Sequence, residues 1–336
     1  MLLSKIANLK NQLDTARPFA KEVLNNLEKW FAVELTYSSN AIEGNTLTRM
    51  ETALVLDTGI TIGGKPMKDH LEAINHQAAL HYLKNLVNPQ TGLPDVRETR
   101  ISLDDVLELH RLILKGIDDT NAGGIRRVPV RISGSAVILP NPLKVPLLLD
   151  EMMEWMASTR DDPVTFAALA HYKLVTIHPF VDGNGRTARL LMNLILMQHG
   201  YPPAIILPKD RLQYIQSLQQ AQLGGSIDAY LQLIYQAVHK SLQIYLKAIR
   251  HETPTEVEPS DNLLKIGALA KATHESISTI RYWTKIGLIP VANATAAGYQ
   301  LYDQATIETC HTIRALQAKR YTLDEIAGML DDRNAH

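Results

Sequence analysis

The side chains most able to do chemistry lie close together between His178 and Arg189, in the segment HPFVDGNGRTAR. Gly183 and Gly185 alternate there with short polar residues, and glycine permits the conformations that turn successive backbone N–H groups toward one anion. The apolar residues that follow recur at helical spacing, so a helix should begin near the second glycine and add the partial positive charge of its N-terminus. The segment therefore predicts a phosphate-binding loop.

The charged side chains of this segment complement a bound phosphate. Arg186 and Arg189 stand three residues apart, so both can present their forked donors to phosphate oxygens. Asp182 among these cations is best explained as a ligand of Mg²⁺, which usually combines one or two carboxylates with substrate phosphates. His178 precedes the loop, and its near-neutral pKa suits removal of a proton from an attacking hydroxyl. The glycines alone would also fit an ordinary turn, with His178 packed at a helix end.

A second polar pattern lies upstream, in YSSNAIEGN at positions 37–45. Ser39 and Glu43 are four residues apart and should share one helix face, and Gly44 can take the left-handed conformation that ends a helix. By itself this pattern would also fit a solvated glutamate before a helix-capping glycine.

The composition describes an ordinary globular protein without a dominant charge. The 336 residues are 46% hydrophobic, enough for a large core in two or three domains, and the formal net charge is -1. Net charge therefore gives no argument for nucleic acid or an anionic membrane as partner. The only cysteine, Cys310, excludes an intramolecular disulfide. No apolar run approaches the roughly 20 residues that span a bilayer, so we expect a cytoplasmic protein without a membrane partner.

Apolar residues recur at three-to-four spacing through most of residues 1–250, which predicts helices there. These helices should position the loop. Residues 128–139 instead alternate β-branched and polar residues around a Gly-Ser pair and predict a short β-hairpin. Residues 251–262 carry two prolines and few apolar side chains, as exposed linkers do. We expect an N-terminal helical region at 1–95, a catalytic domain at 96–250, a linker at 251–262 and a further domain at 263–336.

Residues 178–189 resemble the Fic family motif HPFx[D/E]GNGRxxR at every specified position. The resemblance implies a mainly α fold, with a helical Fic core and a small β-hairpin flap. It implies ATP as co-substrate, His178 as general base and Asp182 as the Mg²⁺ ligand. The loop residues that would hold the phosphates are Gly183, Asn184, Gly185, Arg186 and Arg189. Gly185 favours AMP transfer, because related Doc-like kinases carry lysine in the equivalent region.

The resemblance also covers residues outside the loop. The flap, which comprises Ile132, Ser133, Gly134, Ser135, Ala136, Val137 and Ile138, would pair with an extended segment of a target protein and place its hydroxyl. A purely structural hairpin is the alternative. Asn193 and Tyr214 are weaker candidates for the adenine side, and an E-x-x-N-H segment like residues 72–76 occurs in Fic proteins.

The upstream pattern is similar to the inhibitory motif of the same family, [S/T]xxxE[G/N], with Ser39, Glu43 and Gly44 in place. In the family this glutamate pairs with the second arginine of the loop, here Arg189, and occupies the space that the γ-phosphate needs. The resemblance therefore implies an enzyme that is mostly inhibited at rest.

Residues 263–336 resemble the winged helix-turn-helix domain of the MerR family, through IGALAK, IRYW, IGLIP, GYQLYD and YTLDEIAGML. By that analogy the residues facing DNA would be Ser278, Arg281, Tyr282 and Tyr299. MerR proteins usually carry basic wing residues, whereas this chain has NATAAGYQ, and residues 261–336 hold eight basic and eight acidic residues. A neutral module binds DNA weakly unless it dimerises, so docking of a target or of a second subunit stays an alternative.

Together these patterns predict a protein adenylyltransferase that transfers AMP from ATP to a hydroxyl of a target protein or of itself. In some relatives the inhibitory glutamate instead aligns water for removal of AMP, and the sequence leaves this reverse activity open. The alternative is a DNA-binding transcription regulator whose Fic portion only senses ATP, although such a sensor would not need His178 as a base. The sequence also leaves open whether the protein is a homodimer.

Overall fold

The computed structural model describes residues 2–87, 101–132, 134–250, 263–294 and 300–318, with scattered positions from 321 to 329. The chain divides into two compact units, residues 1–251 and 252–336. The mainly α fold class is confirmed for both units. None of the helices in the described ranges combines the length and apolar character required to cross a membrane.

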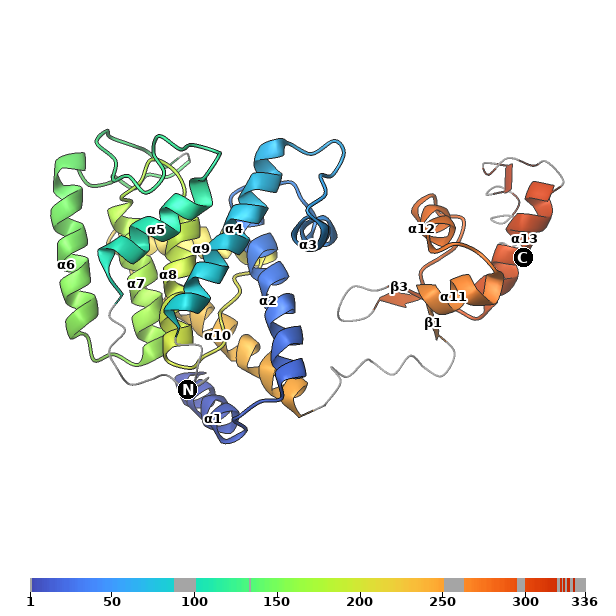
Figure 1. The fold of residues 1–336 in the computed structure, drawn as a ribbon, viewed down its shortest axis with the longest axis horizontal. Helices are drawn as coiled ribbons and strands as arrows, with labels where there is room; N and C mark the ends of the chain where they lie inside the picture. Colours follow the sequence, from blue (N-terminus) through green and yellow to red (C-terminus); the bar gives the residue numbers. More distant parts are fainter. Residues whose placement is uncertain are drawn as a thin grey trace. The chain divides into compact units, whose positions relative to one another are not determined.

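The first unit is a bundle of helices (Figure 1). Their bounds are α1 Leu2–Thr15, α2 Lys21–Ile42, α3 Arg49–Thr58, α4 Met67–Leu86, α5 Leu103–Leu114, α6 Val145–Ser158, α7 Pro163–Ile177, α8 Asn184–Gln198, α9 Arg211–Gln222 and α10 Asp228–Ile249, with single turns of 3-10 helix at Pro142–Lys144 and Pro208–Asp210.

Helix α8 forms the centre of this unit. Its residues 186–196 are buried on every side, and α7, α5, α4 and α2 all pack against it. Leu191, Leu194 and Ile195 are 0% exposed. A helix that is surrounded in this way is fixed by its neighbours, so the loop at its N-terminus has a rigid support.

The loop between α7 and α8 is set by the ends of the two helices. Asp162 caps α7 by accepting from the backbone N–H groups of Val164 and Thr165, each at 3.1 Å. The helix ends where His178 takes a left-handed conformation, with φ 50° and ψ 59°. Gly183, with φ 78°, turns the chain again before α8 begins. The loop is therefore a short bend between two buried helices.

The segment 128–139 departs from the predicted β-hairpin. Its turn is present, because the Ser135 N–H donates to the Ile132 carbonyl at 3.1 Å and Gly134 has φ 74°. The described residues on either side, 128–132 and 134–139, form no strand ladder, so the prediction of paired strands is wrong for them. The apolar residues of the segment are at most half-buried, and Val128 and Ile138 are 53% and 95% exposed, so little buried apolar surface stabilises a two-stranded ribbon here.

The second unit contains the predicted helix-turn-helix. Its elements are β1 Leu263–Lys265, α11 Ile266–Thr273, α12 Ile277–Lys285, β2 Asn293–Ala294, β3 Gln300–Asp303 and α13 Ala305–Ala318. The strands form an antiparallel sheet in the order β1-β3-β2, with Leu264 opposite Tyr302 and Asn293 opposite Leu301. Trp283 is among the buried residues of a small separate core. The connection between β2 and β3, residues 295–299, lies outside the described residues.

Candidate active site

His178 uses one ring nitrogen in a hydrogen bond, and its other ring nitrogen has no hydrogen-bond partner among the described residues. Its Nδ1 lies 3.2 Å from the Val175 carbonyl, and a carbonyl oxygen can only accept, so Nδ1 carries the proton. The lone pair of the neutral imidazole is then on Nε2. The ring is therefore fixed in the tautomer that a general base requires.

The surroundings of His178 keep its imidazole neutral. Burial is the main cause that lowers the pKa below 6.5, and the positive charge of Arg126 lowers it further. The hydrogen bond to Val175 and the carboxylates of Glu43 and Asp182 oppose this shift without reversing it. The side chain is consequently able to accept a proton at neutral pH.

The Asn184 side chain closes the loop on itself. Its Oδ1 accepts from the Phe180 N–H at 3.0 Å, and its Nδ2 donates to the Phe180 carbonyl at 2.9 Å. The prediction that Asn184 holds phosphate stays a prediction: its amide side chain shapes the bend, and the backbone N–H groups at the start of α8 are the loop's candidate anion-binding donors.

Asp182 stands at the open edge of the loop, with its side chain 55% exposed. Its Oδ1 accepts from the Gly183 N–H at 2.6 Å and lies 3.6 Å from Arg186 Nη2. Within the described residues no group of three or more His, Cys, Asp or Glu side chains gathers around a metal position. Asp182 is thus a single carboxylate, which fits Mg²⁺ if phosphate oxygens and water supply the other ligands.

Arg189 joins the loop to the end of α2. Its Nη2 donates to Glu43 Oε1 at 2.7 Å and to the Ser39 carbonyl at 2.9 Å, while its Nε donates to Ser39 Oγ at 3.0 Å. Gly44, with φ 98°, turns the chain directly after the glutamate. The structure therefore brings together the upstream pattern and the second loop arginine.

Arg189 stays charged although it is buried. Burial alone would lower its pKa, but Glu43 and the Tyr214 hydroxyl outweigh that effect and raise the pKa. Gly185 makes room for the pair, because a Cβ on this residue would collide with Glu43 Oε1 and would lie 3.1 Å from Arg189 Nη1. The ion pair thus depends on a glycine in the first turn of α8.

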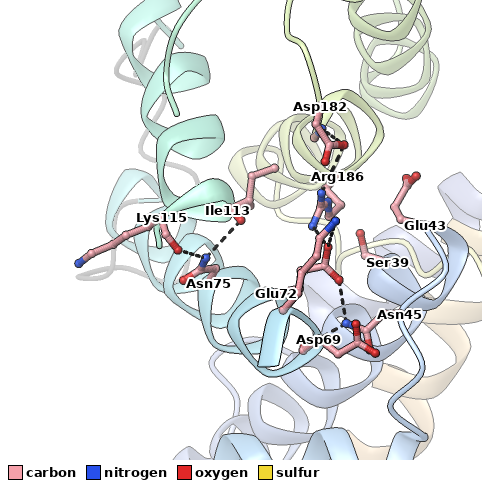
Figure 2. Close-up of polar contacts among 12 residues, drawn as sticks. Ser39, Glu43, Asn45, Asp69, Glu72, Asn75, Ile113, Lys115, Asp182 and Arg186 are labelled. Carbon is pink, nitrogen blue, oxygen red and sulfur yellow. Dashed lines mark hydrogen bonds and ion pairs between the residues drawn. The ribbon is translucent and has the colours of Figure 1, made fainter. Parts of the chain in front are cut away.

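Arg186 has a different partner, which is Glu72 on α4 (Figure 2). Arg186 Nη1 donates to Glu72 Oε1 at 2.8 Å, and the two side chains are only 3% and 7% exposed. The other carboxylate oxygen accepts from Asn45 Nδ2 at 2.8 Å. Glu72 therefore connects the first loop arginine to the segment directly after Gly44, and the Arg186 Nε is buried without a hydrogen-bond partner among the described residues.

His110 on α5 contacts the loop through its ring nitrogen and its ring face. Its Nε2 donates to the Asp182 carbonyl at 3.0 Å, its Nδ1 accepts from the Gly123 N–H at 2.9 Å, and its ring stacks on Phe180 with centroids 3.6 Å apart. Burial is the main cause that lowers its pKa to about 4, so the ring is neutral and both nitrogens are used. The helical spacing of the sequence around residue 110 predicts a helix but not this contact with the loop.

Asn193 and Tyr214 have their polar atoms engaged inside the protein. The Asn193 side chain exchanges two hydrogen bonds with the backbone of Ala204, at 2.8 and 3.3 Å. The Tyr214 hydroxyl lies 2.7 Å from His171 Nε2, and its side chain is 1% exposed. The structure thus places Asn193 against the chain after α8 and Tyr214 beneath Arg189.

In the second unit, Ser278, Arg281 and Tyr282 are exposed on α12, the second helix of the helix-turn-helix. Tyr282 is 53% exposed. The fourth residue of this set, Tyr299, lies outside the described residues.

Two family patterns match the chain in separate regions. The Fic/DOC family matches residues 100–196, and the MerR HTH family regulatory proteins match residues 264–333. The two regions fall within the first and the second unit, respectively.

Individual relatives are similar to the first unit. The chain is 39% identical over 232 residues to protein adenylyltransferase Fic of Drosophila grimshawi, which covers 68% of this chain and 46% of that protein. It is 37% identical over 243 residues to protein adenylyltransferase fic-1 of Caenorhabditis elegans, covering 71% and 45%. The chain spans about half the length of the curated relatives it matches.

Solved structures give the same picture. Fic-1 of C. elegans matches with a TM-score of 0.66 and 34% identity over 75% of this chain and 73% of that chain. A Fic domain containing signaling protein from Bacteroides thetaiotaomicron matches with a TM-score of 0.66 and 29% identity over 74% and 97%.

The buried pair of Glu72 and Arg186 predicts a large loss of stability when the glutamate is removed. Glu72→Ala would remove the 2.8 Å partner of a buried guanidinium and leave it the more distant, exposed carboxylate of Asp182 at 3.6 Å, so we expect the free energy of unfolding to fall by about 3–5 kcal/mol. Glu28→Ala is the matched control, since Glu28 also pairs at 2.8 Å, with Lys84, but both side chains are exposed, and its loss should stay below about 1 kcal/mol. Urea denaturation of the full chain measures both, and equal losses would contradict the prediction.

Proposed function

Because this chain belongs to the Fic/DOC family, we propose that its first unit is an autoinhibited protein adenylyltransferase that transfers AMP from ATP to a hydroxyl of a target protein or of itself. The observation that carries the proposal is the Arg189–Glu43 ion pair of 2.7 Å, beside a neutral His178. Arg189, the proposed phosphate-binding arginine, lies near the base and is ion-paired with a carboxylate of the same chain.

Each group of the loop has one role in the proposed reaction. Nε2 of His178 removes the proton from the target hydroxyl while the hydroxyl oxygen bonds to the α-phosphorus of ATP. The bond from the α-phosphorus to its bridging oxygen breaks, and pyrophosphate leaves. The backbone N–H groups at the start of α8 stabilise the charge that develops on the phosphate oxygens.

Asp182 would hold Mg²⁺ at this site. Its carboxylate is half exposed beside the phosphate-binding loop, and among the described residues its arginine partner is Arg186, at 3.6 Å. When bound, Mg²⁺ would neutralise the charge of the phosphates. Asp182 would then orient the nucleotide, while proton transfer stays with His178.

Glu43 would inhibit AMP transfer until the terminal phosphate of ATP displaces it from Arg189. Arg189 is buried, so an anionic partner stabilises its charge, and it can bind either Glu43 or a terminal phosphate. Arg186 differs, because Glu72 is itself buried and shared with Asn45. Inhibition is therefore a competition for Arg189.

Removal of Glu43 should raise AMP transfer. A hydrogen bond between charged groups contributes roughly 1.5–3 kcal/mol, so we expect Glu43→Gly to label proteins of a lysate about tenfold to a hundredfold faster than the wild type, with ATP labelled on its α-phosphate. His178→Ala in the same background is the negative control. Equal labelling by wild type and Glu43→Gly would refute the inhibitory role. Chasing the labelled lysate with wild-type protein tests the reverse reaction.

The lowered pKa of His178 predicts the acid side of the pH profile. The base must be neutral, so activity falls as pH drops through its pKa, and a lowered pKa moves this fall to a lower pH. Because Glu43 raises the pKa of His178, Glu43→Gly should show a midpoint below 6.5. The rate of AMP transfer at saturating ATP, with ATP affinity measured at each pH, checks this. A midpoint at 6.5 or above would contradict the assignment.

We further propose that the second unit binds DNA through α12. The supporting observations are the exposed side chains of Ser278, Arg281 and Tyr282 on the second helix of the motif and the match to MerR HTH regulatory proteins. Because residues 261–336 are formally neutral, the DNA affinity of this part as a monomer should be weak and should fall with added salt. Dimerisation, which the sequence leaves open, would double the contacts.

Arg281 provides the test of DNA binding. We expect Arg281→Ala in the full chain to weaken binding to genomic DNA fragments about fivefold to a hundredfold, the loss of one arginine contact. Lys247→Ala, which removes an exposed charge from the first unit, should leave binding unchanged. Fluorescence anisotropy at two salt concentrations measures both variants. Equal affinities would favour a protein-docking role for α12.

A further inference from the structure

Arg126 is a buried cation that contacts carbonyl oxygens instead of a carboxylate. It is 3% exposed, and its Nε donates to the His178 carbonyl at 2.7 Å. Its Nη2 donates to the Pro140 carbonyl at 2.7 Å and its Nη1 to the Val128 carbonyl at 3.2 Å. No carboxylate is among its partners in the described ranges, and burial lowers its pKa. Burying a charge in this way costs several kcal/mol, which calls for a compensating role.

The three carbonyl groups belong to two different parts of the site. Val128 and Pro140 stand at the two ends of the segment that carries the flap, and His178 is the proposed base. The described residues on the two sides of the flap turn form no strand ladder that could hold them together. A single planar guanidinium therefore joins both ends of this segment to the backbone of the base.

The same residue supports the bend at His178. A left-handed conformation is strained for a residue with a side chain, and His178 has φ 50° and ψ 59°. The Arg126 N–H also donates to the Pro179 carbonyl at 2.9 Å, directly after the bend. Arg126 thus contacts two successive carbonyl groups of the loop, one through its side chain and one through its backbone.

We propose that Arg126 is a positioning residue that fixes the flap relative to His178, so that a hydroxyl docked along the flap reaches Nε2 of the base. The proposal rests on the proposed function. In this proposal Arg126 aligns the target hydroxyl, while the loop and α8 bind ATP. Lysine could not replace it, because Arg126 contacts the three carbonyl groups through three separate nitrogens and an ammonium group has only one.

The test compares two neighbouring arginines in the full chain carrying Glu43→Gly. Arg126→Lys keeps the charge and removes the fork, whereas Arg127→Lys changes an exposed side chain in the same way and serves as the control. Amide hydrogen exchange is measured by mass spectrometry in peptides from 128–140 and in peptides from α8. Labelling of lysate proteins with labelled ATP and the Kd of ATP are measured on the same samples.

We expect Arg126→Lys to raise exchange between residues 128 and 140 at least tenfold and to leave α8 unchanged. Labelling of lysate proteins should fall at least tenfold, while the Kd of ATP changes less than twofold. Arg127→Lys should match its parent in all three measurements. This split separates alignment of the target from binding of the nucleotide.

Several results would overturn the proposal. Equal exchange in the two lysine variants would mean that Arg126 does not hold the flap. A parallel rise of exchange in α8, or a loss of ATP affinity as large as the loss of labelling, would make Arg126 a general structural residue. If the Glu43→Gly parent labels no protein, the proposed function fails, while the exchange data still decide whether Arg126 fixes the flap.

Discussion

The ion pair between Arg189 and Glu43 is the interaction on which the rest of the site depends. Arg189 sits on a helix that is buried on every side, so an anionic partner stabilises its charge strongly. Glu43 supplies that partner only because α2 ends directly before it and because Gly185 has no side chain. The end of α2 and the start of α8, with the glycines there, therefore place Glu43 against the Arg189 guanidinium. We propose that the terminal phosphate of ATP competes with Glu43 for this guanidinium.

The two loop arginines differ in how deeply their carboxylate partners are buried. Arg186 pairs with Glu72, whose side chain is 7% exposed and also accepts from Asn45, so this contact joins α4, α8 and the chain after α2. Glu43 is 37% exposed, so water and ligand reach it more easily. The buried pair suits a permanent support, and the accessible pair suits an exchangeable inhibitor. His110 adds a third support by holding the Asp182 carbonyl.

Local sequence predicted the features that depend on neighbouring residues. The bend from His178 to Gly185 and the shared face of Ser39 and Glu43 follow from short spacings, and both are present. Glu72, His110 and Arg126 were missed as functional residues because their partners lie 114, 72 and 52 residues away. The paired strands of the hairpin were wrongly predicted because alternation in sequence does not reveal whether a face is buried. Asn184 looked like a phosphate ligand, yet its side chain binds Phe180.

We propose that Glu43 and the terminal phosphate of ATP compete for Arg189. Calorimetric affinities for ATP and ADP, measured with Mg²⁺ for the wild type and for Glu43→Gly, test it most directly because the two nucleotides differ only in that phosphate. We expect similar affinities for ATP and ADP in the wild type, and a preference for ATP of about tenfold or more in Glu43→Gly, the contribution of one charged hydrogen bond. The same ATP-to-ADP ratio in both proteins would contradict the account.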